Sequence, residues 1–161
     1  MDTKLTISPL LAELDERCPS GYALPLHIKY SRPTLLFITY PHSWINVYSQ
    51  KGYVMHDPAV RWGFENLGIT TWDSLRESDS LGVLEESKNH GMVYGTVIAI
   101  ERNGSRSIGG FSREDRNFTD EENTYFKSVL EIIHDLTQNK EQLPAAEVAE
   151  LTRLSITLTQ G

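Results

Sequence analysis

The chain has 161 residues, a length that ordinarily forms one domain with its own hydrophobic core. Hydrophobic residues make up 39% and charged residues 23% of it, a composition typical of globular proteins and not of disordered or fibrous ones. The formal net charge of -7 argues against a surface that neutralises nucleic-acid phosphates by itself, because such binding depends on Lys and Arg.

Cysteine usage and hydropathy narrow the class further. Cys18 is the single cysteine, which excludes an internal disulfide and a cysteine-rich zinc site, and we interpret it as a small buried or boundary residue. No basic-then-apolar leader opens the chain, and no apolar run of about 18 residues occurs in it. We therefore expect a cytoplasmic protein with no membrane contact.

The first half of the chain predicts a helix, two strands and two further helices. Apolar residues at helical spacing indicate a helix over 3–17, and β-favouring stretches over 22–30 and 34–40 indicate a hairpin. A helix is predicted over 42–50. The pair Asp57-Pro58 predicts an N-cap and first turn for a helix that ends near residue 66.

The second half predicts one helix, a hairpin and a final helix. Residues 81–90 have an amphipathic pattern, and strand-like segments at 93–100 and 105–112 are joined by an Asn-Gly turn. Thr119 and Glu122 form a capping box before a helix that ends near residue 136. The order of elements predicts an α+β fold, a three-layer α/β/α sandwich with a mainly antiparallel sheet of four to five strands.

Three aromatic residues are the most unusual local feature. Tyr40, Trp44 and Tyr48 are spaced by four residues, so they are expected on one face of a helix that starts near Pro41. Their rings offer apolar walls and their N–H and O–H groups offer donors, which suits a ligand with an apolar body and a few carbonyl groups. From the spacing alone, ordinary core packing is the favoured interpretation, and a ligand site is the alternative.

Asp57 has two possible roles. A carboxylate before Pro is first of all a helix cap, but facing a pocket it can accept a hydrogen bond from a ligand amide N–H. Trp72 is expected in a loop or short extended piece, and Gly109-Gly110 indicates a bulge or a close approach of another group.

No metal or catalytic site is predicted. The histidines lack paired ligand spacing, and neither a G-x-S-x-G elbow nor a cysteine nucleophile signature occurs. The histidines are His27, His42, His56, His90 and His134.

Taken as a set, the aromatic residues, the Asp-Pro pair and two later positions resemble the autoinducer-binding domain of LuxR-type quorum-sensing regulators over about residues 5–138. The residues that carry this resemblance are Tyr40, Trp44, Tyr48, Asp57, Pro58, Trp72 and Gly95. The resemblance implies a sandwich similar to GAF and PAS domains, a non-enzymatic role, no cofactor, and an acyl-homoserine lactone between the sheet and the helices.

The resemblance also implies a role for each position. Trp44 would donate to the lactone carbonyl, Asp57 would accept the amide N–H, and Tyr40 would donate to the amide carbonyl. Tyr48 would wall the acyl chain, and Trp72 would close the region around the lactone ring. Each polar atom of a desolvated ligand needs such a partner, because an orphan costs about 1 to 3 kcal/mol.

The late strand departs from the family pattern. Many members place Ser or Thr where this chain has Gly110, and Ser107 or Ser112 can substitute only if the register differs. We include Gly110 and Ser112 among the candidate ligand-binding residues, and the acyl length and third-carbon substituent stay open.

The C-terminal segment is a second departure. We divide the chain into a binding domain at 1–139 and a linker with the start of a helix-turn-helix domain at 140–161. Because the recognition helix is missing, DNA binding is expected only through a helix-turn-helix that is incomplete here. The family implies a homodimer. The chain is either a fragment or a natural short form.

Three alternatives remain at this stage. A GAF- or PAS-like sensor of another small molecule would keep the aromatic pocket without needing Asp57. A ligand-blind truncated regulator would act by heterodimerisation. An enzyme that hydrolyses the lactone or amide would need an activated nucleophile or metal set, and the sequence offers neither.

Overall fold

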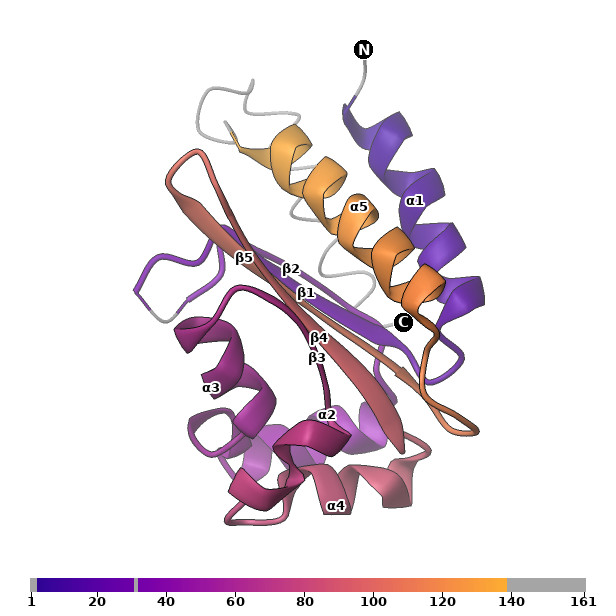
Figure 1. Ribbon diagram of the computed structural model, residues 1–161, viewed down its shortest axis with the longest axis vertical. Coiled ribbons are helices and arrows are strands. Elements are labelled where there is room, and N and C mark those ends of the chain that lie inside the picture. The colour runs from indigo at the N-terminus through magenta and orange to yellow at the C-terminus, as the bar shows by residue number, and fades with distance from the viewer. Residues whose placement is uncertain (1–2, 31, 139–161) are drawn as a thin grey trace.

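The computed structural model describes residues 3–30 and 32–138, which form an antiparallel sheet of five strands between two layers of helices (Figure 1). The elements are α1 (Thr3–Arg17), β1 (Tyr22–Leu26), β2 (Leu35–Ile38), α2 (His42–Gln50), η1 (Tyr53–Met55), α3 (Pro58–Glu65), β3 (Gly68–Thr71), η2 (Asp73–Ser78), α4 (Val83–Ser87), η3 (Lys88–His90), β4 (Tyr94–Arg102), β5 (Ser105–Arg113) and α5 (Asp120–Thr137), where η marks a 3-10 helix. The predicted linker at 140–161 lies outside the described residues.

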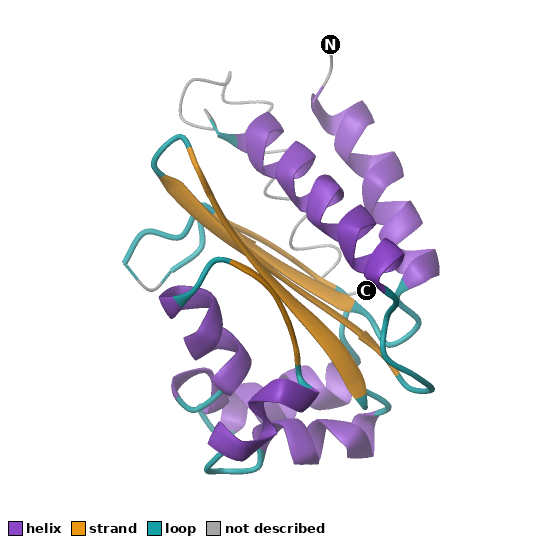
Figure 2. Ribbon diagram, in the orientation of Figure 1, coloured by secondary structure: helices purple, strands orange, loops and turns teal. Residues whose placement is uncertain are grey.

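The sheet has the strand order β2-β1-β5-β4-β3, and each pair of neighbours is antiparallel. Helices α1 and α5 cover one face, and α2, α3 and α4 cover the other (Figure 2). This arrangement confirms the predicted three-layer α+β fold. Within the described part of the chain, no helix has the length and hydropathy needed to cross a bilayer.

Local sequence signals determine the turn between β4 and β5 and the start of α5. The turn between β4 and β5 has positive φ at both Asn103 (53°) and Gly104 (75°), the conformation that an Asn-Gly hairpin favours. The Thr119 hydroxyl accepts from the Glu122 N–H, and the Glu122 carboxylate accepts from the Thr119 N–H. The predicted hairpin and capping box are both confirmed.

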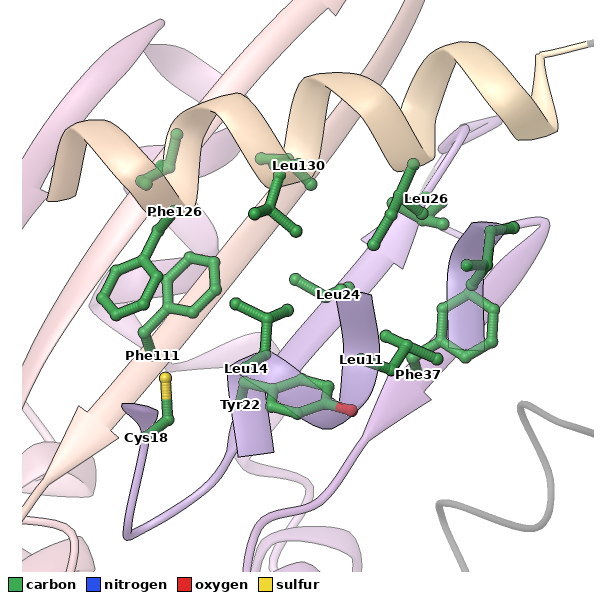
Figure 3. Close-up of a cluster of buried hydrophobic side chains, with 14 of the residues drawn as sticks. Leu11, Leu14, Cys18, Tyr22, Leu24, Leu26, Phe37, Phe111, Phe126 and Leu130 are labelled. Atoms are coloured by element: carbon green, nitrogen blue, oxygen red, sulfur yellow. The ribbon is translucent and has the colours of Figure 1, made fainter. Parts of the chain in front are cut away.

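The face covered by α1 and α5 is filled by hydrocarbon and aromatic side chains (Figure 3). The rings of Phe111 and Phe126 stack with centroids 4.5 Å apart and join β5 to α5. Leu14 from α1 and Tyr22 from β1 are fully buried beside them. Cys18 is 1% exposed in this core, which confirms that it is a buried residue.

The first hairpin is shorter than predicted. The strand expected over 22–30 ends at Leu26, because His27 and Tyr30 have positive φ values of 50° and 60° that leave the extended region. Its partner covers 35–38 instead of 34–40. The resulting loop carries two residues, Ile28 and Pro33, to the cavity described below.

The middle of the chain also differs from prediction. The helix expected over 81–90 begins at Val83, because Gly82 has a left-handed φ of 70°, and its last turn is the 3-10 helix η3. The Asp79 carboxylate accepts from the N–H groups of Val83 and Leu84 and so holds this start. Trp72 follows the short strand β3, which pairs with β4.

Candidate functional site

A cavity of about 290 Å³ lies between the sheet and the layer formed by α2, α3 and α4. Its lining is mostly apolar. The strands contribute Ala23, Pro25, Leu36, Ile38, Val97, Ile108, Gly109 and Gly110, the loop between β1 and β2 contributes Ile28 and Pro33, and the helical layer contributes Tyr40, Trp44, Ile45, Tyr48, Val54, Asp57, Ala59, Val60, Phe64, Trp72, Val83, Leu84, Ser87 and Met92.

Six of the eight candidate residues line this cavity, and two do not. The six are Tyr40, Trp44, Tyr48, Asp57, Trp72 and Gly110. Gly95 and Ser112 lie outside the lining, although both belong to the strands that form its floor.

The aromatic residues reach the cavity from two elements. Trp44 and Tyr48 lie on α2 with ring centroids 5.8 Å apart, as their spacing predicts. Tyr40 precedes this helix, so it does not share the helical face that the spacing predicts and reaches the cavity from the segment after β2. Tyr53 from η1 packs against both α2 rings, at 6.0 Å from Trp44 and 6.1 Å from Tyr48. No spacing signal pointed to Tyr53.

Asp57 acts as a helix cap and also faces the cavity. Its Oδ1 accepts from the Ala59 N–H at 2.9 Å, which confirms the predicted N-cap of α3. Its Oδ2 accepts from the Tyr48 hydroxyl at 2.9 Å. Burial raises the pKa of Asp57, whereas the Tyr48 hydrogen bond and the backbone N–H groups of Ala59 and Val60 act in the opposite direction.

Three donors around the cavity have no hydrogen-bond partner among the described residues. The Trp72 indole N–H is buried without one. The Trp44 indole N–H and the Tyr40 hydroxyl make no hydrogen bond to the described part of the chain either. Burial raises the pKa of Tyr40, so this phenol stays protonated and remains a donor at neutral pH. An unpaired buried donor such as the Trp72 indole N–H is costly, and a ligand with carbonyl groups would offer acceptors to the Trp44 and Tyr40 donors that line the cavity.

Two glycines leave room for these aromatic rings. A Cβ at Gly95 would overlap the indole of Trp72, which therefore lies flat against β4. A Cβ at Gly110 would lie 2.7 Å from the Tyr40 hydroxyl oxygen. The regular pairing of β4 with β5 continues through Gly109 and Gly110, so the pair marks a close approach and not a bulge.

The two serines considered as substitutes for a family hydroxyl are engaged elsewhere. The Ser112 hydroxyl donates to the Tyr94 carbonyl at 2.8 Å and does not line the cavity. The Ser107 hydroxyl lies 2.7 Å from Nδ1 of His134, which is on α5 and hence on the opposite face of the sheet. The cavity wall at Gly110 therefore has no hydroxyl of its own from β5.

The strand residues that form the apolar wall of the cavity were not predicted from the sequence. The alternation of side chains along each strand is the signal that could have found them. Along β1, Ala23 and Pro25 face the cavity, and the alternate residues belong to the core under α1 and α5. The same holds for Leu36 and Ile38 on β2. Among the described residues, no group of three or more His, Cys, Asp or Glu side chains is arranged to hold a metal ion.

Comparison with known proteins finds one family model that matches most of the chain. A family model described as "Autoinducer binding domain" matches residues 21–135. The transcriptional activator protein VanR of Vibrio anguillarum is 30% identical over 69 residues, which are 42% of this chain and 29% of VanR. The matched part thus spans less than a third of that relative.

Solved structures share the fold at low sequence identity. The structure of SdiA in complex with octanoyl-rac-glycerol has a TM-score of 0.64 at 16% identity, and the match covers 96% of this chain and 78% of SdiA. The N-acylhomoserine lactone dependent LuxR family factor CepR2 from Burkholderia cenocepacia has a TM-score of 0.53 at 13% identity, covering 84% of this chain and 94% of CepR2. These likenesses support the fold.

Proposed function

Since the chain belongs to the autoinducer-binding domain family of LuxR-type regulators, a non-enzymatic family, we propose that it is a receptor for an acyl-homoserine lactone. The observation that carries this proposal is the convergence of the Trp44 N–H, the Tyr40 hydroxyl and the Asp57 carboxylate on a mostly apolar cavity. An acyl-homoserine lactone has the complementary set of groups, namely two carbonyls, one amide N–H and a hydrocarbon chain. No cofactor is needed for this role.

The polar end of the cavity supports one orientation of the ligand. The Trp44 indole donates to the lactone carbonyl, the Tyr40 phenol donates to the amide carbonyl, and the Asp57 carboxylate accepts the amide N–H. Trp72, whose indole packs on the backbone of Gly95, contacts the lactone ring. The Trp44 and Tyr40 donors, which make no hydrogen bond to the described residues, then each gain an acceptor.

The apolar part of the cavity supports the place of the acyl chain. We propose that it lies along the apolar lining to which β2 contributes Leu36 and Ile38 and α3 contributes Val60 and Phe64. Phe64 is 38% exposed although it lines the cavity, so this end reaches the protein surface. Burial of the chain supplies the main binding free energy, about 0.8 kcal/mol for each CH₂ group.

A second candidate ligand is an acylglycerol. SdiA, which shares the fold, was solved with octanoyl-rac-glycerol. The glycerol hydroxyls would supply donors to Asp57 in place of the amide N–H, and the ester carbonyl would accept from Tyr40 or Trp44. The same apolar wall serves either acyl chain.

Binding is proposed to act through stability and assembly. A ligand that binds only the folded state adds about 2.7 kcal/mol when its concentration is a hundred times its Kd. We propose that this filling of the cavity favours a homodimer in the cytoplasm, and that DNA is reached only through a complete helix-turn-helix.

The test is thermal melting of the purified chain with acyl-homoserine lactones of short, medium and long chains and with octanoylglycerol. A rise in Tm that depends on chain length and is reduced in Trp44→Phe supports the lactone receptor. A rise with octanoylglycerol alone favours the second candidate. If none of these compounds shifts Tm, the better hypothesis is a sensor of another small molecule or a ligand-blind regulator that acts by heterodimerisation.

A further inference from the structure

The Tyr48 hydroxyl is engaged in a way that the expected role of an acyl-chain wall does not require. It donates to Oδ2 of Asp57 at 2.9 Å, while the other carboxylate oxygen accepts from the Ala59 backbone. Within the described residues, Tyr48 is the one side chain that donates to Asp57. Tyr48 therefore helps to orient the carboxylate that faces the cavity, together with the backbone N–H groups at the start of α3.

We propose that Tyr48 is a positioning residue that makes the cavity select acyl amides over acyl esters, by keeping Asp57 oriented as an ionised acceptor. The inference rests on the proposed function and adds a determinant of ligand class to it. A carboxylate has about four acceptor positions, so Asp57 can still accept one hydrogen bond from a ligand after the contacts with Tyr48, Ala59 and Val60 are made.

The chemistry of the ligand explains the selectivity. An amide N–H donates to an ionised carboxylate in a charge-assisted hydrogen bond. An ester has an oxygen at the same place, and its lone pairs face the carboxylate without any hydrogen between them. The ester therefore loses the bond and leaves Asp57 unpaired in a desolvated site, which costs more than the bond alone.

The groups around Asp57 explain why its ionised form depends on the Tyr48 hydrogen bond. Burial raises the pKa of Asp57, and the Tyr48 hydrogen bond is the largest influence that lowers it. The other titratable groups near it are Tyr40 and Asp79, and the exposed His56 precedes it in the chain. Asp79 also raises the pKa of Asp57. Without the Tyr48 hydroxyl, Asp57 would take up a proton more readily and could then donate to an ester oxygen.

The experiment compares N-octanoyl-homoserine lactone with its ester analogue, α-octanoyloxy-γ-butyrolactone, which differs only in having oxygen in place of the amide N–H. The ratio of the two Kd values is measured between pH 5 and 8 for the wild type and Tyr48→Phe. We expect the wild type to favour the amide by at least tenfold at pH 7.5. In Tyr48→Phe this preference falls about tenfold, and its loss on acidification begins at a higher pH.

Tyr53→Phe is the matched control. Tyr53 also donates its phenol hydrogen to a carboxylate, that of Glu86, and its ring packs against Tyr48, but it does not line the cavity. The variant removes an equivalent bond from the same aromatic cluster. Its amide-to-ester ratio and pH profile should match those of the wild type.

A double-mutant cycle with Asp57→Asn isolates the coupling. If Tyr48 acts through Asp57, adding Tyr48→Phe to Asp57→Asn leaves the amide-to-ester preference unchanged. Asp57→Asn alone also tests the proposal if Tyr48→Phe does not fold, because its amide-to-ester preference should then fall towards one. An equal loss of affinity for both ligands in Tyr48→Phe would mean that Tyr48 only contacts the acyl chain and does not position Asp57. Absence of binding of either ligand to the wild type would instead reject the proposed function.

Discussion

The two faces of the sheet use the same strands for opposite purposes. Under α1 and α5, the side chains of Phe111, Phe126 and Leu130 fill the space between sheet and helix and are at most 1% exposed. Under α2, α3 and α4, the alternate strand residues line a cavity, and aromatic donors near it lack partners among the described residues. The difference indicates that stability is concentrated on one face and ligand recognition on the other.

Polar groups sharpen this contrast. On the packed face, the ring of His27 lies 4.2 Å from that of His134, and all four ring nitrogens have partners. With the hydrogen on Nε2 of each ring, His27 donates to the His134 carbonyl and Thr137, while its Nδ1 accepts from Ser105. The packed face thus pairs the ring nitrogens of both histidines internally, although the Tyr22 hydroxyl is buried there without a partner among the described residues. On the cavity face, the unpaired groups are donors that line or adjoin the cavity.

The largest expected effect is on the packed face. Phe126→Ala removes a fully buried ring that stacks on Phe111, so we expect a loss of about 3 to 5 kcal/mol in the free energy of unfolding. Urea denaturation followed by circular dichroism measures it. A loss below about 1 kcal/mol would contradict the idea that this face holds most of the stability.

Two glycines test how the cavity face is built. Gly95→Ala places a methyl group in the Trp72 indole, a rigid ring, and should cost about 1 to 3 kcal/mol of stability as well as ligand affinity. Gly110→Ala meets only the hydroxyl end of Tyr40, 2.7 Å away, so it should weaken binding with little change in stability. Urea titrations and binding assays of both variants check the pair, and equal losses of stability would refute the distinction.

The histidine pair predicts a dependence of stability on pH. Burial is the main cause that lowers the pKa of His27, and the nearby His134 lowers it further. The unfolded chain then binds the proton more readily, so this contribution is present above the ordinary histidine pKa of about 6.5 and is lost as the pH falls below it. The slope of the free energy of unfolding against pH should not exceed about 1.4 kcal/mol per unit for this one proton.

His27→Asn tests that dependence, since Asn tolerates the positive φ of 50° at this position. The difference between wild type and variant is measured from pH 8 to pH 5, which cancels the opposite contribution of Asp57, whose pKa is raised. The wild type should lose stability more steeply on acidification. Parallel curves would show that His27 does not titrate on unfolding in this range.

The smallest expected effect is on the cavity wall. Ile38 is only partly buried and faces the cavity, so Ile38→Ala should cost about 1 kcal/mol of stability, far less than Phe126→Ala. It should still weaken binding of long acyl chains more than short ones, because it removes a contact along the chain. Calorimetric titration with lactones of different length measures this, and equal weakening for all lengths would place the chain elsewhere.

The sequence by itself determined the features that depend on near neighbours. Asn103-Gly104 specified the hairpin, Thr119 and Glu122 specified the start of α5, and Asp57 specified the cap of α3. Each signal acts between residues at most three apart, so it operates whatever the rest of the chain does. The family resemblance also rested on spacing, and the comparisons confirmed it.

Only the tertiary structure decided what the candidate residues touch. Sheet register and helix packing bring the Tyr40 hydroxyl against Gly110, lay Trp72 on Gly95, and join His27 to the His134 carbonyl across 107 residues of sequence. The Tyr48 bond to Asp57 likewise requires α2 and the start of α3 to meet. Such contacts depend on how whole layers pack, and no local pattern encodes that distance or direction. Spacing could therefore nominate the residues, but packing alone determined which donors remained unpaired around the cavity.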